Sequence, residues 1–514
     1  MSPSQISSGA IVLAALTVAL ALKYPDRALF DEHRENVVYP KGLPLVGNLL
    51  NISKNKDRYF EYVVEIYEKL DTLTFRSSSL TLPSNISTVD PRNVEYILKH
   101  NFENYSKGEY FHKVFDDFLG KGIFNSDGEN WRLQRKAAAQ IFHVRNFQTE
   151  FTRVFVEHIN TLNTHILEKA ASDYSVIDLH NVMLRFTMDI FVNIAFGVKV
   201  DSLLKKIDFA DSFDAIQFYN FRCFIFPLNS VTERVKEGLS FWNNREKTIA
   251  QHLDIVNDFA YKIIKERHEA LENEDENNNS FNENTDLLYR FMKTKTPDGN
   301  LYTDKELRDS MLNFIVAGRD TSAQTLSWFF YNIMLYPRIE NKLLQEVNKY
   351  ITDGIENDTT ALYEATKKMT YFHAVLSEVL RLFPGVPGNR RQALNDDIWP
   401  DGTQILKGEY VNYQTFCQGR LTKIWGPDAK EFKPERWIAS NGSLIRAEQG
   451  KWSAFNAGPR LCLGMNMATL EIIITTAMVL KKYKFRPVPG HKIEFLNQVT
   501  LSMKNGMKVF VERR

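Results

Sequence analysis

The chain has 514 residues, a formal net charge of only +1 at neutral pH and three cysteines. The balanced charge leaves no basic footprint for nucleic acid, so we exclude nucleic acid as a partner. An odd and low number of cysteines with no pair spacing indicates a reduced, cytosol-facing protein without a disulfide framework.

The first predicted element is a membrane anchor over residues 1–23. Its apolar run, residues 6–22, would extend about 26 Å as a helix, at the short limit of a bilayer span. A cleaved signal peptide is the alternative, because residues 19–21 are similar to a cleavage site. No Lys or Arg precedes the run, whereas Lys23 and Arg27 follow it. This asymmetry favours an uncleaved, single-pass anchor with the rest of the chain in the cytosol.

Residues 24–48 are predicted to be a linker that ends in a proline-rich hinge, because prolines fix the backbone φ angle and cannot continue the anchor helix. The remainder, residues 49–514, contains no internal repeat, no P-loop and no second domain large enough to bind a flavin. Short strand-like runs near residues 72–89, 403–413 and 498–503 interrupt a pattern that is otherwise mostly helical. The sequence therefore predicts a mainly α catalytic domain with a small β region.

A helix is predicted over residues 129–142. Trp131 and Arg135 are four positions apart and therefore share one face of this helix. Aromatic-rich segments lie on either side of it in the sequence, at residues 102–124 and 218–226. Aromatic residues at such density form either a core or the wall of an apolar pocket, and the pattern alone leaves both open.

A second, longer helix is predicted over residues 303–336, where a capping signal marks the start and a proline follows the end. Its middle contains Ala317 and Gly318, followed by Asp320 and Thr321. Thr321 can donate a hydrogen bond to the carbonyl four residues earlier and bend the helix. That local hydrogen bond would by itself account for the threonine.

Glu378 and Arg381 are one helical turn apart in a helix predicted over residues 371–383. Such a pair is ordinarily exposed and contributes about a few tenths of a kcal/mol. Apolar residues surround this pair in the sequence, so we expect it to be internal. Residues 434–437 supply Arg436 as a third member, and a buried charged triad is costly unless it is complete.

The most informative segment is the loop around Cys462. Gly458 lies four positions before this cysteine and Gly464 two after it, and glycines let the backbone fold back close to the sulfur. Arg460 places a cation nearby, and a helix predicted over residues 465–478 would favour a thiolate at its N-terminus. A lone cysteine is most often a small buried hydrophobe. A thiolate held in such a loop is, however, suited to bind haem iron.

Five residues of this loop resemble the haem-binding signature of the cytochrome P450 family, F-x-x-G-x-R-x-C-x-G. The family consists of haem-thiolate monooxygenases, and the resemblance implies its single-domain fold. It also implies a haem b (iron protoporphyrin IX) cofactor with Cys462 as the axial metal ligand. Phe455 would pack beside the sulfur, and Arg460 would pair with a haem propionate. The fixed positions of the signature are filled by Phe455, Gly458, Arg460, Cys462 and Gly464.

Other segments are similar to the same family. Trp131 and Arg135 match its W-x-x-x-R helix, and Arg391 matches a cation beside the propionates. The resemblance implies that the two aromatic-rich segments cover the substrate pocket.

The segment around Asp320 and Thr321 looks like the family's A-G-x-D-T pattern. There the acid and the alcohol relay protons during dioxygen activation, and Ala317 and Gly318 would form the dioxygen groove. The family's structural triad is matched by Glu378, Arg381 and Arg436.

Residues 40–510 are most similar to the fungal alkane and fatty-acid ω-hydroxylase branch of the family. The closest similarity is in the segments 122–131, 317–321 and 455–460. This implies that one oxygen atom from O2 is inserted into the terminal C–H bond of a long-chain fatty acid or alkane. A sterol, xenobiotic or secondary metabolite stays open as the substrate. A reductase-independent isomerase or dehydratase and a non-catalytic haem protein are further alternatives, against which the Asp320–Thr321 pair argues.

Electrons would have to come from a partner, because the sequence contains no nicotinamide or flavin site. The resemblance implies NADPH–cytochrome P450 reductase, with cytochrome b5 as an additional donor. It also implies a lipophilic substrate, membrane lipid around the anchor, and a location in the endoplasmic reticulum membrane.

Overall fold

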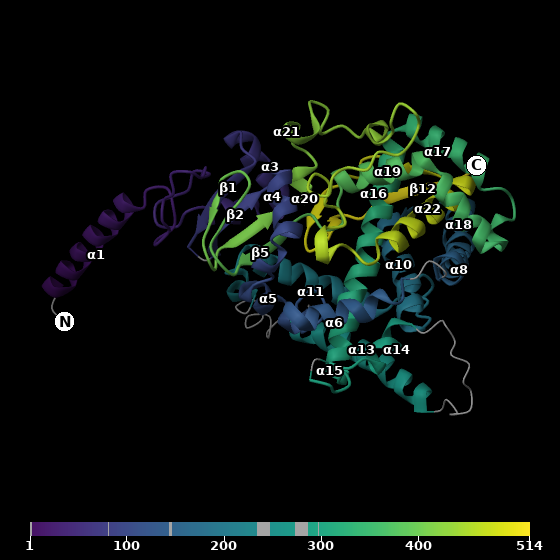
Figure 1. The fold of residues 1–514 in the computed structure, drawn as a ribbon, viewed down its shortest axis with the longest axis horizontal. Coiled ribbons are helices and arrows are strands. Elements are labelled where there is room, and N and C mark those ends of the chain that lie inside the picture. The colour runs from purple at the N-terminus through teal and green to yellow at the C-terminus, as the bar shows by residue number, and fades with distance from the viewer. Residues whose placement is uncertain (1–2, 81, 143–145, 234–246, 273–285, 297) are drawn as a thin grey trace.

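The computed structural model describes residues 3–80, 82–142, 146–233, 247–272, 286–296 and 298–514. Helices form most of the body, and the largest sheet lies at the end of the body from which the N-terminal segment extends (Figure 1). The prediction of a mainly α fold with a small β region is confirmed. The helices are α1 (Pro3–Lys23), α2 (Leu49–Asn55), α3 (Tyr59–Leu70), α4 (Pro91–Glu95), α5 (Glu109–Leu119), α6 (Gly128–Ala139), α8 (Thr152–Leu162), α9 (Glu168–Asp173), α10 (Leu179–Phe196), α11 (Asp208–Ile225), α13 (Ile249–Glu272), α14 (Leu287–Lys293), α15 (Asp304–Ile315), α16 (Thr321–Leu335), α17 (Pro337–Tyr350), α18 (Thr359–Lys368), α19 (Thr370–Leu382), α20 (Thr415–Gln418), α21 (Thr422–Trp425) and α22 (Met465–Lys482).

The main sheet has the strand order β1-β2-β8-β5-β3, and β2 and β8 are its parallel pair. In β5, Arg390 is paired with Asn412 and Arg391 with Val411, so the two arginines project from opposite faces of the sheet. A three-stranded sheet, β4-β12-β9, joins the C-terminus to the helical part. The strands are β1 (Thr74–Ser79), β2 (Leu82–Thr88), β3 (Tyr105–Ser106), β4 (Ile177–Asp178), β5 (Asn389–Ala393), β6 (Asp397–Ile398), β7 (Gln404–Ile405), β8 (Tyr410–Tyr413), β9 (Tyr483–Pro487), β10 (Phe495–Asn497), β11 (Leu501–Met503) and β12 (Lys508–Arg513).

A nearly continuous helical column runs from α15 through the π-helical turn Val316–Asp320 into α16. Thr303 and Glu306 cap its start reciprocally, and α17 begins at Pro337 directly after its end. Most residues of α16 are buried, and they occur on all faces of the helix. A helix that is buried all round lies inside the core, so this column is at the centre of the helical part. The helix predicted over residues 303–336 is therefore confirmed, with an irregular turn at its middle.

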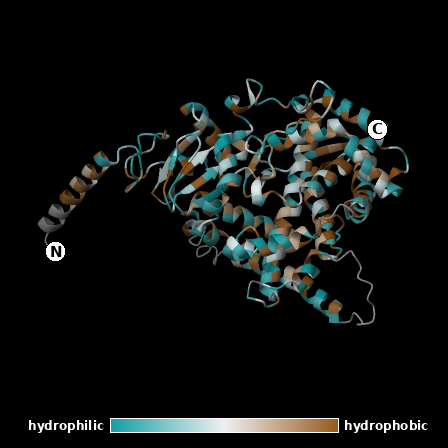
Figure 2. Ribbon diagram, viewed as in Figure 1, coloured by the Kyte–Doolittle hydropathy of each residue, from teal (hydrophilic) through white to brown (hydrophobic). Residues whose placement is uncertain are grey.

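Helix α1 projects away from the rest of the protein (Figure 1), and Figure 2 shows it largely in the colours of hydrophobic residues. Ile11, Leu13 and Leu22 are 70%, 67% and 77% exposed. Within the described part of the chain, no helix has the length and hydropathy needed to cross a membrane. The membrane span expected over residues 6–22 is therefore not shown by the structure.

Candidate active site

The loop that carries Cys462 is fixed by its own backbone. The Cys462 N–H donates to the Phe455 carbonyl at 2.9 Å, and Gly464 occupies the N-cap of α22. Gly458 has φ +59°, and a Cβ there would lie 2.0 Å from the Leu98 carbonyl oxygen. Only glycine fits that position, because both the backbone angle and the close approach exclude a side chain.

Cys462 is exposed, whereas the other two cysteines are buried. Burial of its surroundings nevertheless raises the pKa of the Cys462 thiol, while the N–H groups of Gly464 and Met465 and the Arg135 cation act in the opposite direction. The helix N-terminus therefore acts in favour of the thiolate, as expected, but desolvation outweighs this effect in the protein alone. A coordinated metal ion deprotonates a thiol outright, so an accessible thiol in this loop still fits a metal ligand.

Helix α6 brings Trp131 and Arg135 to the cysteine loop. Arg135 Nη2 donates to the Leu461 carbonyl at 2.7 Å. The Arg460 guanidinium lies 4.4 Å from the centre of the Trp131 ring and donates to Asp127 Oδ1 at 2.7 Å. The structure therefore brings Trp131, Arg135 and Arg460 together on one side of Cys462.

Arg391 and Lys107 complete a basic cluster with Arg135 and Arg460. Arg391 is buried, and its Nη2 lies 3.4 Å from the Tyr413 hydroxyl. Burial, with Arg391 and Arg460 nearby, lowers the pKa of Lys107 well below its usual range. Among the described residues, Arg460–Asp127 is the only ion pair that this cluster makes. The excess of positive charge fits a dianionic group such as the two haem propionates, beside a thiol that fits the iron.

Sequence reasoning missed Lys107. It is a single basic residue before Gly108, and nothing in its local sequence separates it from a surface lysine. Only the fold, which places it beside Arg391 and Arg460, distinguishes it.

Thr321 lies at the end of the irregular turn in the central column. Its Oγ1 donates to the Ala317 carbonyl at 2.5 Å. A Cβ on Gly385 would lie 3.3 Å from Thr321 Cβ, so the segment after α19 packs over this threonine. A Cβ on Gly318 would overlap the Phe191 ring of α10, which gives this glycine a packing role between two helices.

Asp320 points into a buried polar network. It accepts hydrogen bonds from Arg319 Nη1 and Gln217 Nε2, both at 2.8 Å. Arg319 is bound in turn by Asp214 at 2.6 Å. Burial raises the pKa of Asp320 to about 6, and Asp320, His180 and Asp214 line a cavity of about 240 Å³. A carboxyl group that titrates near neutral pH in a polar cavity can both accept and donate protons.

A second carboxyl group near Thr321 was also missed by sequence reasoning. Glu471, on α22, accepts a hydrogen bond from Ser322 Oγ at 2.8 Å. Burial raises the pKa of Glu471 to about 8, so it is mainly protonated at neutral pH. Its contact links the central column to the helix that follows Cys462.

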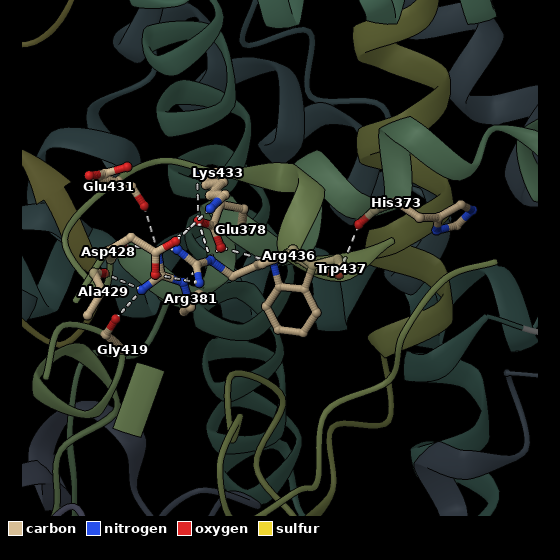
Figure 3. A network of polar contacts seen from close by, with 11 residues as sticks. His373, Glu378, Arg381, Gly419, Asp428, Ala429, Glu431, Lys433, Arg436 and Trp437 are labelled. Atoms are coloured by element: carbon tan, nitrogen blue, oxygen red, sulfur yellow. Dashed lines mark hydrogen bonds and ion pairs between the residues drawn. The ribbon is translucent and has the colours of Figure 1, made fainter. Parts of the chain in front are cut away.

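Glu378, Arg381 and Arg436 meet in a buried network (Figure 3). Arg381 donates to both carboxylate oxygens of Glu378 at 2.7 Å, and Arg436 Nε donates to Glu378 Oε1 at 3.0 Å. Trp437 Nε1 adds a hydrogen bond of 2.9 Å to the same carboxylate. The remaining Arg381 donors bind the carbonyls of Gly419, Ala429 and Glu431, so the network fastens residues 419–437 to α19.

A helical fold with an accessible cysteine in a glycine-shaped loop, flanked by cations, is the arrangement that a haem-thiolate protein requires. Comparison with known proteins agrees with this class. The family model "Cytochrome P450" matches residues 38–509, and the chain belongs to this family. It is a cytochrome P450 monooxygenase whose cofactor is haem, and the family uses O2, a lipophilic substrate and a reductase as redox partner.

Several relatives are similar over most of their length. Cytochrome P450 704B1 of Arabidopsis thaliana is 36% identical, covering 92% of this chain and 95% of the relative. Cytochrome P450 86B1 of the same plant is 38% identical, over 85% and 79%. Cytochrome P450 monooxygenase cyp1 of Mycosarcoma maydis is 34% identical, over 96% and 78%. Because plant and fungal proteins match alike, the comparison does not single out the fungal branch expected from the sequence.

Replacing Thr321 with alanine should uncouple electron use from product formation. The variant should still bind haem and substrate, because the hydrogen bond of Thr321 Oγ1 is made to the Ala317 carbonyl of its own helical column. With reductase present, NADPH consumption should continue while hydrogen peroxide rises at the expense of product, if Thr321 supplies protons as the family resemblance implies.

Thr325→Ala is the matched control, because Thr325 Oγ1 makes the same kind of hydrogen bond, 2.7 Å to the Thr321 carbonyl. It should stay coupled. Equal coupling in the Thr321 variant and wild type would mean that Thr321 only shapes its helix.

Proposed function

We propose that this enzyme hydroxylates the terminal carbon of a long-chain fatty acid or alkane. The observation that carries the proposal is an aromatic cluster in which both aromatic-rich segments meet; we call it the aromatic wall, because it would line the substrate pocket. Phe224 of α11 lies 5.8 Å from the rings of Phe111 and Phe115 and 5.7 Å from Tyr110, all on α5. The Tyr110 hydroxyl also donates to the Cys223 carbonyl at 3.0 Å. Apolar walls with few polar groups suit a long aliphatic chain.

The site residues have separate roles in this proposal. Cys462 would bind the haem iron through its sulfur, and the basic cluster of Lys107, Arg135, Arg391 and Arg460 would hold the propionates. When bound, the haem supplies the activation of dioxygen and the insertion of one oxygen atom into a C–H bond. Asp320 would exchange protons with its polar cavity, and Thr321 would hold a proton at Oγ1.

The N-terminal segment would attach the enzyme to the endoplasmic reticulum membrane as a single-pass anchor over residues 1–23. The row of exposed apolar side chains on α1 supports this part of the proposal. Soluble proteins rarely expose a contiguous apolar surface of this kind. Residues 24–48 would be the hinge, and residues 49–514 the cytosolic catalytic domain. NADPH–cytochrome P450 reductase would be the electron donor, with cytochrome b5 as an additional one.

Product analysis tests the substrate class. With reductase and NADPH, terminal alcohols should form from the fatty acids, the alkanes or both in a panel of twelve to eighteen carbons. Several neighbouring chain lengths should react, because apolar walls discriminate by only about 1–3 kcal/mol per methylene. Oxidation of a sterol or a polycyclic aromatic compound, with no turnover of the panel, would eliminate this substrate class and leave the monooxygenase assignment intact.

A further inference from the structure

Arg390 is a buried cation that has no carboxylate partner in the part of the chain that the structure describes. Its side chain projects from the face of β5 opposite to Arg391, and the residue is 6% exposed. Nε donates to Asn412 Oδ1 at 2.9 Å. Among the described residues, no carboxylate forms an ion pair with it, and none accepts a hydrogen bond from its two Nη nitrogens. A buried cation is costly unless it is paired.

Aromatic rings compensate for only part of this cost. The guanidinium carbon lies 4.3 Å from the centre of the Phe224 ring and 5.5 Å from that of Tyr110. Both residues belong to the aromatic wall described above. Burial still lowers the pKa of Arg390, so the surroundings leave the charge poorly satisfied.

A cavity of about 30 Å³ lies against Arg390. Asn412 and Asn85 line it beside the guanidinium and are joined by a hydrogen bond of 2.8 Å. One water-sized group needs about 10–15 Å³, so the cavity has room for the two oxygen atoms of a carboxylate. The rest of the lining is mostly apolar or aromatic, and it includes Ile52, Tyr59, Val63, Ile66, Phe75 and Ile225. Pro40 and Asn48 of the linker also line the cavity.

We propose that Arg390 binds the carboxylate head group of a fatty-acid substrate in this cavity. The inference rests on the proposed function and narrows it, because an alkane or an ester has no group for this site. Two Nη donors in one plane match the two oxygens of a carboxylate.

The position of Arg390 relative to Thr321 agrees with attack at the far end of the chain. Gly385, which packs over Thr321, is five residues before Arg390. Five residues span at most about 18 Å. The cavity at Arg390 is therefore within reach of a long acyl chain whose methyl end lies at Thr321, and the proposal requires the chain to run in that direction.

Substrate-binding spectral titrations of the holoenzyme test the proposal with palmitic acid, methyl palmitate and hexadecane. Wild type should bind the acid about tenfold to a hundredfold more tightly than the ester. Arg390→Gln should lose this preference and bind ester and alkane as wild type does. Arg390→Lys should retain part of it, because the charge remains without the planar pair of donors.

Arg222→Gln is the matched control, because this buried arginine is on the same helix as Phe224 but already forms an ion pair with Asp57. It should keep the wild-type preference for the acid. A wild-type enzyme that binds methyl palmitate as tightly as palmitic acid would overturn the proposal, whether or not the variants fold. If the alkane and the ester are hydroxylated at the terminal carbon as efficiently as the acid, the inference about Arg390 fails but the proposed function stands. If none of the three compounds is hydroxylated, both the inference and the proposed function fail.

Discussion

Arg381→Met should prevent the protein from accumulating as a folded haem protein. The change leaves the Glu378 carboxylate buried with Arg436 as its remaining charged partner, and frees the carbonyls that Arg381 fastens to α19. Breaking a buried ion pair in this way costs about 3–5 kcal/mol. That loss is a large fraction of the total stability of a domain, about 5–15 kcal/mol.

Soluble expression, haem content and the urea midpoint of unfolding measure this effect. Arg338→Met is the matched control, because Arg338 also pairs with a glutamate, Glu435, but is 60% exposed at its side chain. The control should lose less than about 1 kcal/mol. An Arg381 variant that folds, binds haem and unfolds like the control would show that the network is not structural.

Cys462→Ser should abolish monooxygenase turnover while the chain still folds. Cys462 is exposed and fills no part of the apolar core, so the substitution creates no cavity. Serine lacks the sulfur that donates electron density to haem iron, which the chemistry of this family requires. Turnover with reductase, per mole of folded protein, should fall below detection. Turnover at the wild-type rate would contradict the assignment of Cys462 as the ligand.

Features with local signals could be predicted from the sequence. The central column has a capping box at Thr303 and a proline after its end, so its bounds follow from residues a few positions apart. The pairing of Glu378 with Arg381 follows from helical spacing, and the loop around Cys462 follows from its glycines.

The rest depends on contacts between distant segments. Gln217, which binds Asp320, is 103 residues away in the chain, and Asp214 is 105 residues from Arg319. Lys107 and Glu471 gain their significance only from such neighbours. Burial also raises the pKa of Cys462, although the helix N-terminus acts to lower it. Sequence alone does not show this, because desolvation depends on the whole fold.

The carbon monoxide difference spectrum of the reduced protein tests the central claim, that Cys462 makes this chain a haem-thiolate enzyme. Wild type, Cys223→Ser and Cys417→Ser should each show a band at about 450 nm, the position implied by the family resemblance for thiolate-ligated haem. Cys462→Ser should bind haem without that band. A band retained in Cys462→Ser and lost in either of the other two variants would contradict the account.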